Sequence, residues 1–293
     1  MDKTVTVKIK RVSDSTEFNI GTGYDWKFLK NGLDGFGSFD NDINFVDNGI
    51  HDGGIITSSR ISKVDRTIKC AYLVLDSNDT QRRKVTAFFN VKDTYKVYIT
   101  YGGRTLWAEG TIYKYDLSMS ADIKARMDLT VTFTFANPYL KSYDDFGSDI
   151  ASKKNMIAFP YLSSFNVAPY GVTGGVFNFA QKVNLNNDGD VETYCTAIFK
   201  ASGDVVNPSL IIDGNYVRVI DTMVNGDTIE MDFTALPPTV KKNGVNYIGH
   251  CDRTSAFTDM AIKVGDVSVQ YSADDGDGNL SVSFYYNKLY ASI

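Results

Sequence analysis

The chain has 293 residues, enough for two domains, and its hydrophobic fraction of 43% is typical of a folded globular protein. A formal net charge of −5 gives no electrostatic gain on a phosphate backbone, so we expect no nucleic acid partner. The three cysteines lie far apart and predict no disulfide framework, which fits assembly in a reducing cytosol. We expect no signal peptide and no membrane span, because the N-terminus alternates polar and apolar residues and every apolar run is short.

The first predicted elements are a strand and a helix. Residues 5–9 alternate apolar with polar side chains, which is typical of a half-buried strand. A helix is expected to begin at Asp79 or Thr80 and to end near Asn90. Its apolar face has the spacing i, i+3, i+4 and consists of Val85, Phe88 and Phe89. Such a helix should lie on a sheet.

A hairpin and a long strand follow the helix. Gly102-Gly103 separates two apolar-rich stretches and predicts a tight turn, because glycine accepts positive φ at both central positions. Residues 129–135 alternate strictly between apolar residues and threonine, and Asn137-Pro138 then ends the pattern. Proline lacks the N–H that a sheet interior needs, so we interpret Asn137-Pro138 as the end of an N-terminal domain.

The remainder of the chain predicts a second β domain. Residues 139–182 are interrupted by proline and glycine and are interpreted as a connector that carries one or two strands. Alternation resumes near Val183 and continues to the end with closely spaced turns, the profile of a β-sandwich. We therefore expect a mainly β chain with two domains, residues 1–140 and residues 141–293.

No constellation of catalytic or metal-ligating residues stands out in the sequence. The two histidines belong to no zinc motif, and the neighbours His250 and Cys251 would point to opposite faces of a strand. The stretch 274–279 resembles part of a calcium loop but lacks the required glycine and glutamate, so a hairpin loop is the better interpretation. No phosphate-binding loop or nucleophile elbow occurs. We expect no cofactor and no enzymatic activity.

Several stretches, taken together, resemble the phage distal tail protein family. In the N-terminal half the similar positions are Asp52, Gly53, Arg60 and Arg66, followed by the helix, the Gly-Gly hairpin and the strand that ends at Asn137-Pro138. In the C-terminal half they are Asn187, Gly189, Asp190, Asn207 and Pro208. Each motif is weak alone. Together, in this order and at this spacing, the motifs extend over nearly the full length of the chain.

The resemblance implies a structural virion protein made in the bacterial cytoplasm and located at the tail tip or baseplate. Its N-terminal domain would be a β-sandwich-like ring domain with one helix and a hairpin, six copies of which form a ring. Its C-terminal domain would be a galectin-like sandwich that projects outward. The implied partners are further copies of itself, the major tail tube protein and a tail-associated hub, tip or lysin protein, with a receptor-binding protein as a further candidate.

The predicted ring interface is the hairpin at residues 95–115. Its aromatic residues Tyr98, Tyr101 and Trp107 could supply apolar contact to a neighbouring subunit, although Trp107 fits a domain core equally well. Two alternatives are a cell-wall saccharide-binding module that uses C-terminal aromatics such as Tyr247 and Tyr271, and a glycan-degrading enzyme. The absence of an aromatic cluster counts against the first alternative, and the absence of a catalytic motif counts against the second.

Overall fold

The structure is a computed structural model, and it describes residues 5–73, 78–118, 126–143, 146–155, 175–178 and 182–293. The chain divides into two compact units, residues 1–143 with 289–293 and residues 144–288. The predicted connector contains the short strand β10 (Leu140–Ser142) and the strands β11 (Phe146–Asn155) and β12 (Gly175–Asn178). The rest of it, including Pro160, Pro169, Gly171 and Gly174, lies outside the described residues.

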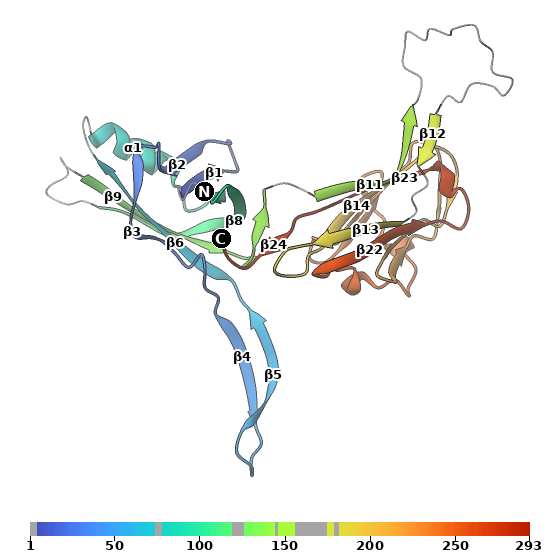
Figure 1. The fold of residues 1–293 in the computed structure, drawn as a ribbon, viewed down its shortest axis with the longest axis horizontal. Helices are drawn as coiled ribbons and strands as arrows, with labels where there is room; N and C mark the ends of the chain where they lie inside the picture. Colours follow the sequence, from blue (N-terminus) through green and yellow to red (C-terminus); the bar gives the residue numbers. More distant parts are fainter. Residues whose placement is uncertain (1–4, 74–77, 119–125, 144–145, 156–174, 179–181) are drawn as a thin grey trace, which may run out of the picture. The chain divides into compact units, whose positions relative to one another are not determined.

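The first unit is built on one nine-stranded sheet in the order β24-β10-β8-β7-β1-β2-β3-β6-β9 (Figure 1). Its other strands are β1 (Thr6–Arg11), β2 (Glu17–Gly21), β3 (Trp26–Asp34), β6 (Val64–Leu73), β7 (Thr94–Tyr101), β8 (Arg104–Leu117), β9 (Arg126–Phe135) and β24 (Leu289–Tyr290). The long strand β8 pairs with β7, with β10 and also with β9. The sheet therefore curls until β9 meets β8, and its inner face encloses a core.

The strand alternation of the sequence corresponds to burial in this core. Buried and half-buried residues alternate along β9. The buried ones include Leu129, Val131, Phe133 and Phe135, which are essentially inaccessible to solvent. On the other face of the sheet, the hydroxyl of Thr132 lies 2.9 Å from that of Thr67 on β6. Burial of these large apolar side chains supplies the main stabilisation of the unit.

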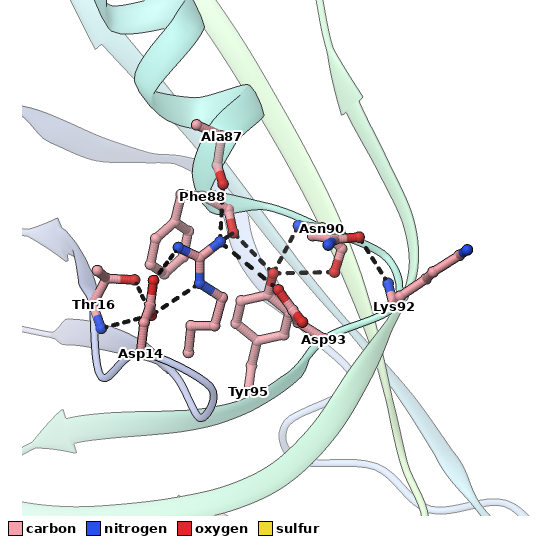
Figure 2. A network of polar contacts seen from close by, with 9 residues as sticks. Asp14, Thr16, Ala87, Phe88, Asn90, Lys92, Asp93 and Tyr95 are labelled. Carbon is pink, nitrogen blue, oxygen red and sulfur yellow. Dashed lines mark hydrogen bonds and ion pairs between the residues drawn. The ribbon is translucent and has the colours of Figure 1, made fainter.

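The predicted helix is α1 (Asn78–Phe88), and its expected apolar face is confirmed. Val85, Phe88 and Phe89 are buried in the core of the first unit. The last carbonyl groups of a helix have no partner inside the helix, and α1 has no basic residue in its last turn. Arg11 at the end of β1 supplies both the missing hydrogen-bond donor and the missing positive charge. Its Nη1 donates to the carbonyl oxygens of Ala87 at 2.9 Å and Phe88 at 3.2 Å (Figure 2).

A polar network fixes Arg11 and the residues after the helix. The carboxylate of Asp14 accepts two hydrogen bonds from the Arg11 guanidinium, and its Oδ1 also accepts from the backbone N–H and hydroxyl of Thr16 (Figure 2). These contacts hold the pKa of Asp14 well below its usual range. The hydroxyl of Tyr95 donates to the carbonyl oxygen of Phe88 at 2.9 Å and accepts from the backbone N–H of Asn90 at 2.7 Å. The network attaches α1 to β1 and β7.

The second unit contains a seven-stranded sheet, β12-β11-β23-β14-β19-β20-β21, and a four-stranded sheet, β13-β22-β16-β17, with a small β15-β18 pair. The strands are β13 (Lys182–Asn187), β14 (Cys195–Ala201), β15 (Val205–Val206), β16 (Ser209–Ile212), β17 (Asn215–Arg218), β18 (Thr222–Met223), β19 (Thr228–Asp232), β20 (Thr239–Lys242), β21 (Val245–Asn246), β22 (Gly265–Ser272) and β23 (Leu280–Tyr286). Short 3₁₀ turns are Ile248–His250, Phe257–Asp259 and Asp277–Asn279. One core contains residues of both sheets, including Phe199, Leu210, Val269 and Phe284. The unit is a β-sandwich.

The mainly β fold class is confirmed, with α1 as the one α-helix among the described residues. The Gly-Gly hairpin is confirmed as well, since Tyr101 pairs with Arg104 across Gly102 and Gly103, which have φ of 60° and 83°. Within the described parts of the chain, no helix has the length and apolar character to cross a membrane.

Candidate assembly surface

A two-stranded arm stands out from the first unit (Figure 1). It consists of β4 (Asn41–Asp47) and β5 (Gly54–Ile61), which pair only with each other. We call residues 41–61 the arm. Every residue of β4 is exposed, and so is every residue of β5 except the half-buried Ile61. The described residues of the body therefore give the arm no support.

The exposed side chains of the arm include large apolar ones. Phe45 lies opposite Ile56 on one face, and Val46 lies opposite Ile55 on the other. These four side chains are 61%, 58%, 55% and 62% exposed, in the order Phe45, Ile56, Val46, Ile55. A two-stranded hairpin in water is marginally stable, and exposed apolar clusters mark interaction sites. The arm thus has the character of a surface that another molecule covers.

Four of the family-motif positions of the first unit lie in the arm or just after it. Asp52 and Gly53 form the turn at its tip, where Gly53 has φ of 98°, a conformation that favours glycine. Arg60 is exposed on β5, opposite Asp42. Arg66 lies on β6, beyond the base of the arm. Two arginines that look equivalent in the sequence therefore have opposite environments.

Arg66 is fully buried and joins three parts of the first unit. Its Nε donates to the carbonyl oxygen of Gly35 at 3.2 Å and its Nη2 donates to that of Pro138 at 2.5 Å. The guanidinium lies 5.3 Å from the ring centres of both Phe36 and Phe135. Burial lowers the pKa of Arg66 to about 10, so the group is still charged at neutral pH. Arg66 connects the strand before the arm, the strand after it and the end of β9.

The aromatic residues of the predicted ring interface lie on one hairpin but in different surroundings. Trp107 is half-buried and its Nε1 donates to the carbonyl oxygen of Ser142 at 2.9 Å. The ring of Tyr98 packs at 6.1 Å from Trp107 and at 5.9 Å from Tyr143. Tyr101, at the hairpin turn, is 46% exposed. The hairpin pairs with β1 on one side and with β9 and β10 on the other, so both of its edges are occupied. The ring interface stays a prediction, and it would use the side chains of the hairpin and not the addition of a strand.

The two Asn-Pro motifs both form turns. The side-chain oxygen of Asn137 accepts from the backbone N–H of Tyr139 at 3.0 Å, directly after β9. Asn207, with φ of 51°, follows the short strand β15, and its side chain donates to Asp274 at 2.7 Å. Pro208 then precedes β16, and its carbonyl oxygen accepts from Val219 at 3.0 Å. Both motifs therefore redirect the chain at a strand end.

The Asn-x-Gly-Asp motif of the second unit is structural in the same sense. Asn187 is fully buried, and its Nδ2 donates to the carbonyl oxygens of Ile262 at 3.2 Å and Val191 at 3.3 Å. Its Oδ1 accepts from the backbone N–H of Gly189 at 3.1 Å. Asp190 follows at the surface. Sequence similarity singled out Asn187, and its burial explains why an amide with both a donor and an acceptor fits there.

At least two hollows are lined by described residues of the first unit. One, of about 350 Å³, lies between α1 and the strands β2 and β3 and is lined by Phe18, Trp26 and Phe88 together with polar residues that include Asn19 and Lys84. The other, of about 270 Å³, is lined by the tyrosines Tyr24, Tyr98 and Tyr143 and by Lys8. Neither hollow stands out in the sequence, because its lining comes from elements far apart in the chain.

The described residues hold no group of three or more potential metal ligands. His51 is exposed at the arm tip, whereas the ring of His250 stacks on Tyr247 at 3.9 Å. The calcium-like stretch forms the 3₁₀ turn Asp277–Asn279. Burial raises the pKa of Cys70 and Cys195 to about 12 and that of Cys251 to about 11, so these thiols are poor nucleophiles.

Comparison with known proteins identifies the second unit. Residues 188–290 match the family model of the siphovirus-type tail component, C-terminal domain. Residues 188–290 carry a siphovirus tail component domain. This match confirms the resemblance to phage distal tail proteins and the expected place in the virion tail. No curated protein sequence matches the chain.

Solved structures share the fold of this chain over nearly its full length. The Dit protein of phage SPP1, described as a paradigm of the hub adsorption apparatus of phages that infect Gram-positive bacteria, has a TM-score of 0.64 at 11% identity, with 97% of this chain and 98% of that chain covered. The phage P2 baseplate in its activated conformation with calcium gives a TM-score of 0.56 at 12% identity, with both chains fully covered. The strontium form gives 0.54 at 14% identity and 99% coverage of each.

Proposed function

We propose that this tail component is a structural protein whose copies close into a hexameric ring, and that the ring joins the tail tube to the baseplate or tip. The observation that carries the proposal is the arm, because its apolar side chains are left uncovered by the chain itself. The tail component domain and the shared fold supply the setting. The role requires binding surfaces and no catalytic group.

Ring closure fits the geometry of the arm. A ring needs a head-to-tail contact in which one surface of each subunit meets a different surface of the next. At about 3.3 Å per residue, the eight residues of β5 extend roughly 25 Å, far enough to lie across a neighbouring subunit. Covering the arm on both faces removes apolar surface from water at each contact, which favours association.

The two units would divide the work. We propose residues 1–140 as the ring-forming domain and residues 141–293 as the connector and a galectin-like domain that projects from the ring. The neighbours of the ring would be the major tail tube protein on one side and a hub, tip or lysin protein on the other. A receptor-binding protein is the further candidate for the projecting domain.

The saccharide-binding alternative has less support. The suggestion that Tyr271 could form part of an exposed platform is wrong, since this side chain on β22 is buried in the sandwich core. The hydroxyl of Tyr247 donates to Asp221 at 2.7 Å, and one face of its ring is stacked on His250. Sugar-binding aromatic residues need a free ring face, so Tyr247, whose ring is already stacked on one face, is a weak candidate for binding saccharide.

The ring is tested by counting subunits. Mass photometry and negative-stain electron microscopy of the full chain should show particles of six copies. The double variant Phe45→Ser, Ile56→Ser should shift the particles toward monomers without altering thermal unfolding of the body, because these side chains are exposed in the monomer. Tyr113→Ser, which removes a side chain that is 69% exposed on β8, is the matched control. A chain that stays single at every concentration and beside the other tail proteins would sink the proposal.

A further inference from the structure

We infer that the hollow between α1 and β2 is the site that receives the arm of a neighbouring copy of this chain. The inference rests on the proposed ring and names the surface that the arm would cover. It is supported by three complementary properties of the hollow and the arm, which concern backbone edges, apolar surface and charge.

The hollow offers an open strand edge. β2 pairs with β1 from Glu17 to Gly21 but meets β3 only through Ile20 and Trp26. Within the described chain, the outer edge of β2 from Glu17 to Asn19 therefore has no partner strand. The side-chain oxygen of Asn19, which lines the hollow, is buried and has no hydrogen-bond donor among the described residues. An added strand would supply hydrogen-bond partners to this edge, and each strand of the arm has one free edge.

The floor of the hollow is aromatic. The ring of Phe18 lies 5.4 Å from that of Trp26 and 5.5 Å from that of Phe88. A volume of about 350 Å³ suits a few side chains rather than a folded body. Phe45 with Ile56, or Val46 with Ile55, presents a compact apolar pair of that kind on a narrow support. The uncovered apolar groups of the arm and this aromatic floor would remove each other from water.

The α1 wall of the hollow is opposite in charge to the tip of the arm, whereas the strand wall carries Glu17 and Asp25. Near the base of the arm, Asp42 lies opposite Arg60, whereas Asp47 and Asp52 near the tip have no cationic side chain opposite them. The helix that forms one wall of the hollow carries three cationic residues, Arg82, Arg83 and Lys84, against Asp79. Lys84 itself lines the hollow. An acidic tip is therefore attracted to the α1 wall and repelled by the strand wall with Glu17 and Asp25, which favours an approach along α1.

The site is tested by photo-crosslinking in the assembled ring. A photoreactive amino acid replaces Phe45 in the full chain, and mass spectrometry of mixed isotope-labelled subunits identifies the joined peptides. We expect crosslinks between copies to residues 17–26 and 81–88. The same probe at Tyr113, which is exposed elsewhere on the first unit, is the control and should not label these residues. Trp26 fluorescence in a Trp107→Phe background should change on assembly, because Trp26 lines the hollow.

Charge reversal gives an independent measurement. Lys84→Glu and Asp47→Lys should each weaken ring assembly by about fivefold at low salt, and the double variant should recover most of the loss. Lys92→Glu, an exposed lysine in the loop after α1, is the matched control and should leave assembly unchanged. A ring that forms with crosslinks elsewhere, including the tyrosine-lined hollow, overturns this inference while the ring stands. A chain that remains a monomer overturns the ring and the inference with it.

Discussion

The guanidinium of Arg66 donates to the carbonyl oxygen of Pro138 across 72 residues of sequence, and it joins the buried Arg66 to the half-buried Pro138. The same side chain reaches Gly35 just before the arm. Gly35 has φ of 79°, and a Cβ there would come within 2.7 Å of the backbone oxygen of Asp65, so the approach requires glycine. Arg66 thus fixes the base of the arm to the end of β9.

Replacing Arg66 by methionine should destabilise the first unit by about 2–4 kcal/mol, because the half-buried carbonyl oxygens of Gly35 and Pro138 lose their donor. Urea unfolding of the variant checks this figure. Arg60→Met is the control, since Arg60 is exposed on the arm, and it should change the free energy of unfolding by about 0.5 kcal/mol or less. Equal losses for the two variants would contradict the structural role of Arg66.

The contact between Asp14 and Arg11 should make the docking of α1 sensitive to acid. The pKa of Asp14 is lowered in the folded chain, so its contribution to stability is fully present above its unfolded pKa of about 4. That contribution is lost as the pH falls through the lower, folded pKa. The protection of α1 amides against hydrogen exchange, relative to their intrinsic exchange rate, should therefore fall below about pH 4 in the natural chain.

The variant Asp14→Asn should show faster exchange of α1 already at neutral pH, and its difference from the natural chain should shrink as the pH falls. Asp79→Asn is the control because it removes an exposed ion pair within α1, at 3.2 Å from Arg83, without touching Arg11. Exchange rates of α1 that are the same in Asp14→Asn and the natural chain at neutral pH would argue against the network.

The predicted ring interface on the β7–β8 hairpin can be tested through Tyr101. Tyr101→Ser should weaken ring assembly and leave thermal unfolding of the monomer unchanged, since the side chain lies at an exposed turn. Trp107→Phe should instead cost the monomer about 1 kcal/mol, because it removes the hydrogen bond to Ser142. If the assembled ring tolerates Tyr101→Ser and exchange of residues 95–115 is unaffected by assembly, this hairpin is not an interface.

The cysteines should be unreactive in the folded chain. The raised pKa values of Cys70, Cys195 and Cys251 keep them as thiols at pH 8, and two of them are fully buried. A thiol reagent at pH 8 should label the native protein slowly and label three thiols after unfolding in urea. Rapid labelling of any one thiol in the native protein would show that its surroundings are more open than described.

Much of the strand and helix pattern could be predicted from the sequence, because burial on one face of an element leaves a clear periodicity. The alternation of residues 129–135 and the spacing of Val85, Phe88 and Phe89 both correspond to buried faces. The same rule misleads at the arm, where Phe45 and Ile56 resemble core residues but are exposed. Periodicity predicts that an element has an apolar face, but it does not show whether that face packs within the same chain or against another molecule.

The candidate surfaces were harder to predict, since they depend on contacts between distant segments. The buried Arg66 resembles an ordinary surface arginine in the sequence, and its environment is created by Gly35, Phe135 and Pro138 together. The hollow beside α1 is formed by residues 17–26 and 81–88, which only the folded sheet brings together. The closure of β9 on β8 leaves no local signal either.

The last strand, β24, pairs with β10, and Leu140 lies opposite Tyr290. The chain thus leaves the first unit and returns to it through two strands that are neighbours in one sheet. In chain order the second unit is inserted within the first, and the strands before and after it, β10 and β24, pair with each other. A different domain could therefore occupy the same position without changes to the sheet of the first unit. Cleavage of the chain at either connection would leave the two units covalently joined through the other.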